Sequence, residues 1–173
     1  MSFTGKGDRK VGDKSKPVKI KEPSKIFICS WSDFFHPDAD SWRNEAWAII
    51  RQNNQHIYQI LTKRPERIKQ CLPVDWGNGY PHVWLGVTAE TQEMADERIP
   101  ILLKTKAAIR FVSIEPMLQE IDITKYLPCL DWVICGCESG SGVRPMHENW
   151  VFFLKEQCQT FKVPFFLKQK MMR

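Results

Sequence analysis

Six short apolar segments recur along the chain, and each of them ends in polar or charged residues. They span residues 25–30, 56–62, 83–90, 108–115, 131–138 and 163–169. Successive segments begin 23 to 32 residues apart, which is the spacing of a strand followed by a crossover helix. Near-continuous apolar strands are typical of a parallel sheet whose faces are covered. The pattern therefore predicts parallel strands with their polar tails at one edge of the sheet.

Helical periodicity lies between these segments. It predicts helices near residues 41–53, 65–71, 91–104 and 148–161, and a brief helical turn near 123–127. In the first helix Ser41 is placed to cap the N-terminus. The apolar face of that helix is expected to consist of Trp42, Ala46, Ile49 and Ile50.

Alternating strands and helices predict an α/β fold. Short right-handed crossovers favour the strand order 1-2-3-4-5-6, and hence a partial (β/α) barrel of the TIM type with about six parallel strands. A doubly wound open sheet is the alternative. No Gly-x-Gly-x-x-Gly segment and no Walker lysine loop follows any predicted strand, which argues against a nucleotide-binding open sheet.

Composition limits the class of protein. The chain has 173 residues, 43% of them hydrophobic and 26% charged, which suits a globular domain with a real core. No apolar stretch approaches the roughly 20 residues of a membrane helix, and no signal peptide is recognisable. The six cysteines are scattered, several of them inside apolar segments, which indicates reduced, buried thiols. We therefore expect a cytoplasmic protein that does not contact membranes.

The net charge of +5 is concentrated at the N-terminus. Residues 1–25 hold eight basic and three acidic residues, whereas the remainder holds 17 of each. We expect residues 1–24 to form a disordered basic arm and residues 25–173 to form the barrel domain. Such an arm could contact nucleic acid. A solvated tail is the alternative, and it is favoured because no aromatic residue is interleaved among the lysines.

The polar strand tails are the candidate site, because a curved parallel sheet brings them to one rim. The candidate ligand-binding residues are Ser30, Asp33, Lys63, Arg64, Glu90, Arg144, Lys168 and Gln169. The cations suit an unidentified small polar ligand that is phosphorylated or carboxylated. The alternative is an internal ion-pair network that closes the top of the barrel.

Two carboxylates are candidates for catalysis. Glu115 precedes Pro116, which restricts its backbone, and Glu138 precedes a Gly-Ser-Gly turn. Either could act as a general base or hold a substrate amine or hydroxyl. Arg144 is a candidate partner for Glu138 or for an anionic ligand. Cys135 and Cys137 share one side of a strand, but nothing nearby completes a tetrahedral set, so we predict no metal site. The seven tryptophans are expected to serve core packing.

Several specific motifs follow one another along the chain. They include Lys25-Ile-Phe-Ile-Cys-Ser-Trp-Ser-Asp-Phe-Phe-His, Ile60-Leu-Thr-Lys-Arg-Pro-Glu-Arg, Val83-Trp-Leu-Gly-Val-Thr, Arg110-Phe-Val-Ser-Ile-Glu-Pro and Asp131-Trp-Val-Ile-Cys-Gly-Cys-Glu-Ser-Gly. In this order the motifs resemble an uncharacterised family that is common in phages and prophages and is described as radical-SAM-like barrels. The resemblance covers about residues 23–170.

The resemblance implies a 4Fe-4S cluster and S-adenosylmethionine in complete family members, where three N-terminal cysteines hold the cluster. Residues 1–24 of this chain contain no cysteine. We therefore expect a protein that keeps a polar ligand site at the strand ends but lacks a complete catalytic centre, and a truncated gene product is one explanation that stays open. The alternative is a binding or regulatory protein for a phosphorylated ligand or nucleic acid. The oligomeric state is left open.

Overall fold

Six parallel strands form one curled sheet in the order β1-β2-β3-β4-β5-β6 in the computed structural model, which describes residues 20–140 and 142–168. The strands are β1 (Lys25–Ile28), β2 (Ile57–Thr62), β3 (Val83–Thr88), β4 (Ile109–Ile114), β5 (Trp132–Cys135) and β6 (Phe165–Leu167). The predicted partial barrel and its strand order are confirmed. The sequential order excludes the doubly wound alternative, whose strand order is permuted.

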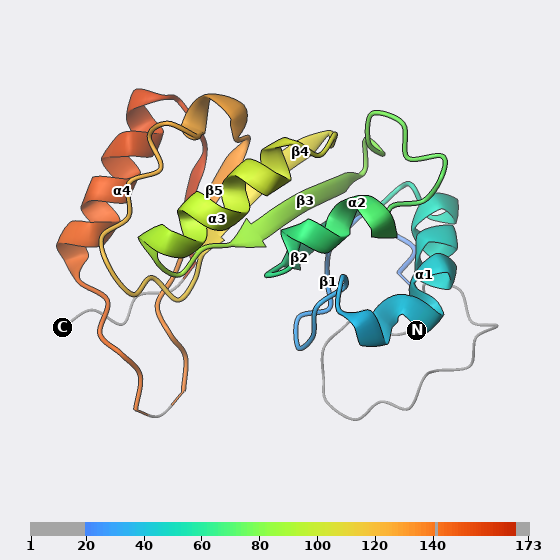
Figure 1. Cartoon of the computed structure of the whole chain (residues 1–173), viewed down its shortest axis with the longest axis horizontal. Helices are drawn as coiled ribbons and strands as arrows, with labels where there is room; N and C mark the ends of the chain where they lie inside the picture. Colours follow the sequence, from blue (N-terminus) through green and yellow to red (C-terminus); the bar gives the residue numbers. More distant parts are fainter. Residues whose placement is uncertain (1–19, 141, 169–173) are drawn as a thin grey trace.

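The helices follow the curl of the sheet from α1 at one end to α4 at the other (Figure 1). They are α1 (Asp40–Gln52), α2 (Ile68–Cys71), α3 (Gln92–Leu103) and α4 (Glu148–Thr160). Of the 3-10 helices in the described residues, η1 (Pro37–Ala39) and η2 (Pro65–Arg67) lead directly into α1 and α2, and η3 (Leu127–Cys129) lies between β4 and β5. The four predicted helices are confirmed to within a few residues, and the turn expected near 123–127 continues into η3.

The predicted N-terminus of the first helix is wrong in one respect. Helix α1 begins at Asp40, directly after η1, and its N-cap residue Ala39 makes no side-chain capping bond. Ser41 therefore lies inside the helix. In α3 the capping chemistry follows the usual pattern, because the Thr91 hydroxyl accepts a hydrogen bond from Met94 N at 3.3 Å.

The main core lies between the sheet and the helices. Alternate strand residues such as Ile28, Ile60 and Leu85 are fully buried there. They pack in one cluster with helix residues that include Trp47 and Ile99. The period of two along each strand places the intervening residues on the opposite, inner face of the sheet.

The inner face carries a row of aromatic rings. Trp132 of β5 lies 5.6 Å from Phe111, 5.8 Å from Trp84 and 6.2 Å from Phe166, measured between ring centroids. Phe166 is 48% exposed, so part of this face is open to solvent. A curled sheet of six strands therefore fills its hollow with large rings.

The expected boundary near residue 24 falls where the sheet begins. The Ser24 carbonyl already accepts a hydrogen bond from Ile57 N at 2.9 Å, directly before β1. Residues 1–19 of the predicted basic arm lie outside the described residues, so the arm stays a prediction. Among the described residues, no helix has the length and apolar character needed to cross a membrane.

Candidate functional site

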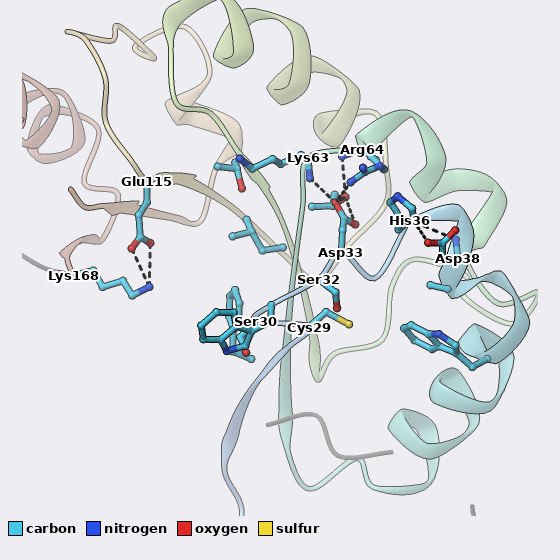
Figure 2. Close-up of a pocket in the computed structure, with 17 residues that line it drawn as sticks. Cys29, Ser30, Ser32, Asp33, His36, Asp38, Lys63, Arg64, Glu115 and Lys168 are labelled. Atoms are coloured by element: carbon cyan, nitrogen blue, oxygen red, sulfur yellow. Dashed lines mark hydrogen bonds and ion pairs between the residues drawn. The ribbon is translucent and has the colours of Figure 1, made fainter. Parts of the chain in front are cut away.

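A cavity of about 880 Å³ opens at the carboxyl ends of the strands. The predicted residues Ser30, Asp33, Lys63, Arg64, Glu115 and Lys168 all line it. Figure 2 shows Glu115 and Lys168 on one side, and Asp33, Lys63 and Arg64 on the other. The remaining lining residues are Phe27, Cys29, Trp31, Ser32, His36, Asp38, Ala39, Trp42, Leu61, Thr62 and Thr88.

Asp33 joins the tail of β1 to the tail of β2. Its carboxylate accepts hydrogen bonds from Phe35 N at 2.9 Å, Thr62 Oγ1 at 2.8 Å and Lys63 N at 3.0 Å. Arg64 Nη1 donates to the same carboxylate at 3.0 Å. With so many donors already bound, Asp33 organises this side of the cavity and positions the two cationic residues that follow β2.

A tight turn precedes Asp33. Strand β1 ends at Ile28 because Cys29 takes a left-handed backbone conformation, with φ 58°. Ser32 N then donates to the Cys29 carbonyl at 3.0 Å and closes the turn. A left-handed conformation costs a non-glycine residue about 1–3 kcal/mol, and such positions cluster at functional sites. The turn carries Trp31, which departs from the expected core packing of the tryptophans, because it is 81% exposed.

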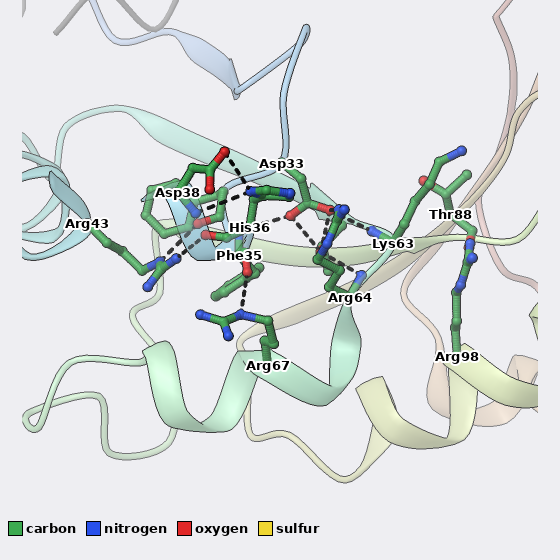
Figure 3. Close-up of polar contacts among 12 residues, drawn as sticks. Asp33, Phe35, His36, Asp38, Arg43, Lys63, Arg64, Arg67, Thr88 and Arg98 are labelled. Carbon is green, nitrogen blue, oxygen red and sulfur yellow. Dashed lines mark hydrogen bonds and ion pairs between the residues drawn. The ribbon is translucent and has the colours of Figure 1, made fainter. Parts of the chain in front are cut away.

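Arg43 and Arg67 hold the loop that follows the turn through hydrogen bonds to its backbone carbonyls (Figure 3). The sequence pattern did not identify these arginines as part of the site. Arg43 of α1 donates from Nε to the Phe34 carbonyl at 2.9 Å and from Nη2 to the His36 carbonyl at 2.8 Å. Arg67 donates to the Phe35 carbonyl at 2.7 Å. Arg43 lies in a helix predicted to be amphipathic, and only the tertiary contacts reveal its role.

Glu90 bridges two cations beside the cavity. It pairs with Lys63, and its other oxygen lies 2.9 Å from Arg98 Nη1. Arg98 also donates to the Thr88 carbonyl at 2.9 Å, which fixes it against the end of β3. Burial opposes ionisation of Glu90, but the hydrogen bond from Lys63 and the charges of both cations outweigh it, so the pKa of Glu90 lies below its ordinary value.

Glu115 and Lys168 form the pair on the other side of the cavity. Lys168 Nζ lies 3.0 Å from Glu115 Oε1, which links the tails of β4 and β6. Gly136 makes room for this carboxylate, because a Cβ atom at that position would lie 3.2 Å from Glu115 Cδ. The expected convergence of tails from distant strands is therefore present.

Glu138 and Arg144 lie outside the cavity lining. They form a bidentate pair, with Nη2 to Oε1 at 2.6 Å and Nε to Oε2 at 3.1 Å, and the Arg144 backbone N–H donates to Oε2 at 2.9 Å. These hydrogen bonds from Arg144 lower the pKa of Glu138 to about 2. The predicted partnership is confirmed, and the pair is separate from the other candidates. Gln169 lies outside the described residues.

The thiols do not form the ligand set that the resemblance implies. All six cysteines lie in the described part of the chain, and within that part no three Cys, His, Asp or Glu side chains are placed to hold a metal ion. Burial raises the pKa of Cys135 to about 12 and that of Cys158 to about 11, so both stay protonated at neutral pH. A 4Fe-4S cluster held by three thiolates therefore does not fit these residues.

Comparison with known proteins identifies a family but no activity. Neither the curated proteins nor the solved structures gave a match. A family model described as "Protein of unknown function (DUF5131)" matches residues 5–172, which is nearly the whole chain. The protein therefore belongs to this family of unknown function.

Proposed function

We propose that the chain binds a small anionic ligand, phosphorylated or carboxylated, in the cavity at the carboxyl ends of the strands. Lys63, Arg64 and Lys168 are the groups that hold the anion. The observation that carries this proposal is their convergence from β2 and β6 on one cavity of about 880 Å³. That volume falls within the range of small-molecule sites, which is about 300–1,000 Å³.

The ion pairs in the cavity are suited to exchange with a ligand. The side chains of Lys63 and Lys168 are each 54% exposed. The two ammonium groups are therefore open to a ligand from the cavity, whereas their partner carboxylates, Glu90 and Glu115, are mostly buried at 13% and 20% exposure. When Lys63 turns to a ligand, Glu90 keeps Arg98 as its partner. The network that closes the rim in the absence of ligand is thus compatible with binding.

Glu115 is the carboxylate that the proposal places beside the ligand. It lines the cavity and is paired with Lys168. A carboxylate in this position can accept a hydrogen bond from a ligand hydroxyl or amine, which sets the orientation of the ligand. Glu138 is held by Arg144 away from the cavity lining.

A radical-SAM-like ancestry agrees with the partial barrel. It does not agree with the positions of the cysteine thiols, because within the described residues they do not form a set that could hold a cluster. We therefore derive no step through a 4Fe-4S cluster or S-adenosylmethionine. The proposal for this chain is ligand binding. Nucleic-acid binding by the N-terminal arm rests only on the charge of residues 1–25. It predicts an affinity that falls steeply with salt and is lost when residues 1–24 are deleted.

Calorimetric titration of the full chain with inorganic pyrophosphate tests the proposal. Because charge-assisted hydrogen bonds contribute about 1.5–3 kcal/mol each, Lys63→Gln and Lys168→Gln should each weaken binding about 10-fold or more. Lys155→Gln is the matched control, because Lys155 is an exposed lysine of α4 outside the cavity lining. Absence of binding by the wild-type chain, or equal losses in all three variants, would refute the proposal.

A further inference from the structure

Trp31 differs in exposure from the buried tryptophans of the core. It is 81% exposed, whereas Trp47 and Trp76 are 1% and 6% exposed. An indole in water forgoes the burial of a large apolar surface, and tryptophan is enriched where one part of its ring meets a partner. Trp31 lines the cavity, so the exposed ring adjoins the proposed ligand.

The turn that carries Trp31 is held at both ends. On one side Cys29 has its unusual φ of 58° and accepts the hydrogen bond from Ser32 N. On the other side Asp33 is bound to the tail of β2, and Phe34, which follows it, is fully buried. The exposure of Trp31 is therefore imposed by the fold. Because the backbone of the turn is ordered before binding, less entropy is lost when a ligand stacks on Trp31 than if the whole turn had to form.

The hydrogen bonds of Asp33 also connect the Trp31 turn to the cationic residues Lys63 and Arg64. Asp33, two residues after Trp31, binds both Lys63 N and Arg64 Nη1. Further apolar surface comes from Phe27, which is 37% exposed, and from Trp42, which packs edge-on against Phe34 at 5.8 Å. One cavity thus combines an exposed indole on a fixed backbone turn, other aromatic surface and adjacent cationic side chains.

We propose that the ligand of this cavity is a nucleoside phosphate whose base stacks on Trp31 and whose phosphate binds Lys63 and Arg64. This inference rests on the proposed function and narrows its ligand class. A planar base matches the exposed indole face, and a phosphate attached to it through a sugar matches the cations beside the turn. The exposed hydroxyl groups of Ser30 and Ser32 lie on the same cavity wall, where they can hydrogen-bond the sugar.

Calorimetry on the full chain with adenosine 5′-monophosphate and ribose 5-phosphate separates the base from the phosphate. Stacking of one base strengthens binding about 5- to 150-fold, so the nucleotide should bind more tightly than the sugar phosphate by a factor in this range. Trp31→Ala should abolish this preference and leave the affinity for ribose 5-phosphate unchanged. Trp31→Phe, which keeps a ring, should retain most of the preference.

The matched control is Phe152→Ala, because Phe152 is a 64% exposed ring on α4 outside the cavity lining. It should leave the preference for the nucleotide intact. Equal affinities of the wild-type chain for the two compounds, or a preference that survives in Trp31→Ala, would overturn the inference but leave anion binding standing. If neither compound binds, the inference is overturned, and the pyrophosphate titration decides separately whether anion binding stands.

A 5′-phosphorylated tetranucleotide tests whether the nucleoside phosphate is a free nucleotide or the 5′ end of a nucleic-acid strand. If it binds more tightly than the mononucleotide and loses that advantage in Trp31→Ala, the ligand is a strand end. If the mononucleotide binds at least as tightly, the ligand is a free nucleotide. A tetranucleotide affinity that Trp31→Ala leaves unchanged counts against stacking in the cavity.

Discussion

Gly86 of β3 lies opposite Phe111 of β4, and the Phe111 ring occupies the space that a side chain at position 86 would need. A Cβ atom at Gly86 would lie 2.5 Å from Phe111 Cζ. The ring itself is fully buried and contacts Trp132, so it has little freedom to move. This pair sets how closely the aromatic residues fill the hollow of the sheet.

Gly86→Ala should lower the free energy of unfolding by about 1–3 kcal/mol, because it overpacks this contact. Urea denaturation measures the change. Combining it with Phe111→Leu, which shortens the obstructing side chain, should cost less than the sum of the two single changes. Strict additivity in this double-mutant cycle would show that the ring is free to yield.

Asp33→Ala should destabilise the chain by about 2–3 kcal/mol, since it removes charge-assisted hydrogen bonds and leaves the buried Thr62 hydroxyl without its acceptor. The unfolding midpoint in urea measures the loss. Asp38→Asn is the matched control, because the Asp38 side chain is exposed and its ion pair is with the neighbouring His36. A loss at position 38 as large as that at position 33 would contradict the role assigned to Asp33.

The side chain of Gln157 in α4 holds the loop at residues 121–123 against the helix by hydrogen bonds to its backbone. Its Nε2 donates to the Ile121 carbonyl at 3.0 Å, and its Oε1 accepts from Ile123 N at 2.8 Å. Gln157→Leu should cost about 2–4 kcal/mol of stability, because both backbone groups lose their partner in a buried place. The exposed Gln159 of the same helix provides the control, and Gln159→Leu should change stability by less than about 0.5 kcal/mol.

Arg144→Gln should raise the pKa of Glu138 from about 2 toward the ordinary glutamate value of about 4.3, because the hydrogen bonds from the guanidinium are lost. An NMR titration that follows the Glu138 side-chain carboxyl carbon measures this directly. A pKa that stays near its wild-type value in the variant would mean that Arg144 does not hold the carboxylate in solution.

Stability should fall on acidification below about pH 6.5, in part through His82. Desolvation lowers the pKa of His82, although a hydrogen bond to the Ile50 carbonyl opposes this. The folded chain therefore binds protons at this site less readily than the unfolded chain, and acid favours unfolding. Urea denaturation between pH 7.5 and 5.5 should show this loss, and His82→Gln should reduce it. An unchanged pH dependence in the variant would exclude His82 as the cause.

Apolar runs were sufficient to place the strands and their order. Strand β2 was predicted at 56–62 and is found at Ile57–Thr62, since a buried strand must consist of apolar residues. Strand β1 ends earlier than predicted, because the left-handed conformation of Cys29 has no signature in the apolar pattern. The convergence of Asp33, Lys63 and Glu115 on one cavity also follows from strand polarity alone.

The side-chain partners were less predictable. The face expected for the first helix included Trp42 and Ile49, which are only partly buried, and the structure buries Arg43 and Trp47 together with Ala46 and Ile50. Arg43 is buried because backbone carbonyls of a separate loop accept its hydrogen bonds, which is a tertiary relationship that periodicity cannot reveal. The exposure of Trp31 likewise depends on a turn geometry that residue types do not specify.

The order of the strands has a consequence for how the chain folds. Each strand pairs with its immediate neighbours in sequence, so within residues 20–140 and 142–168 no ladder joins strands that are not consecutive. Such local connectivity favours faster folding than an interleaved sheet of the same size. During synthesis β1 and β2 can pair as soon as both have left the ribosome, and each later unit adds to a sheet that already exists. We expect assembly to proceed from the N-terminal strands toward β6.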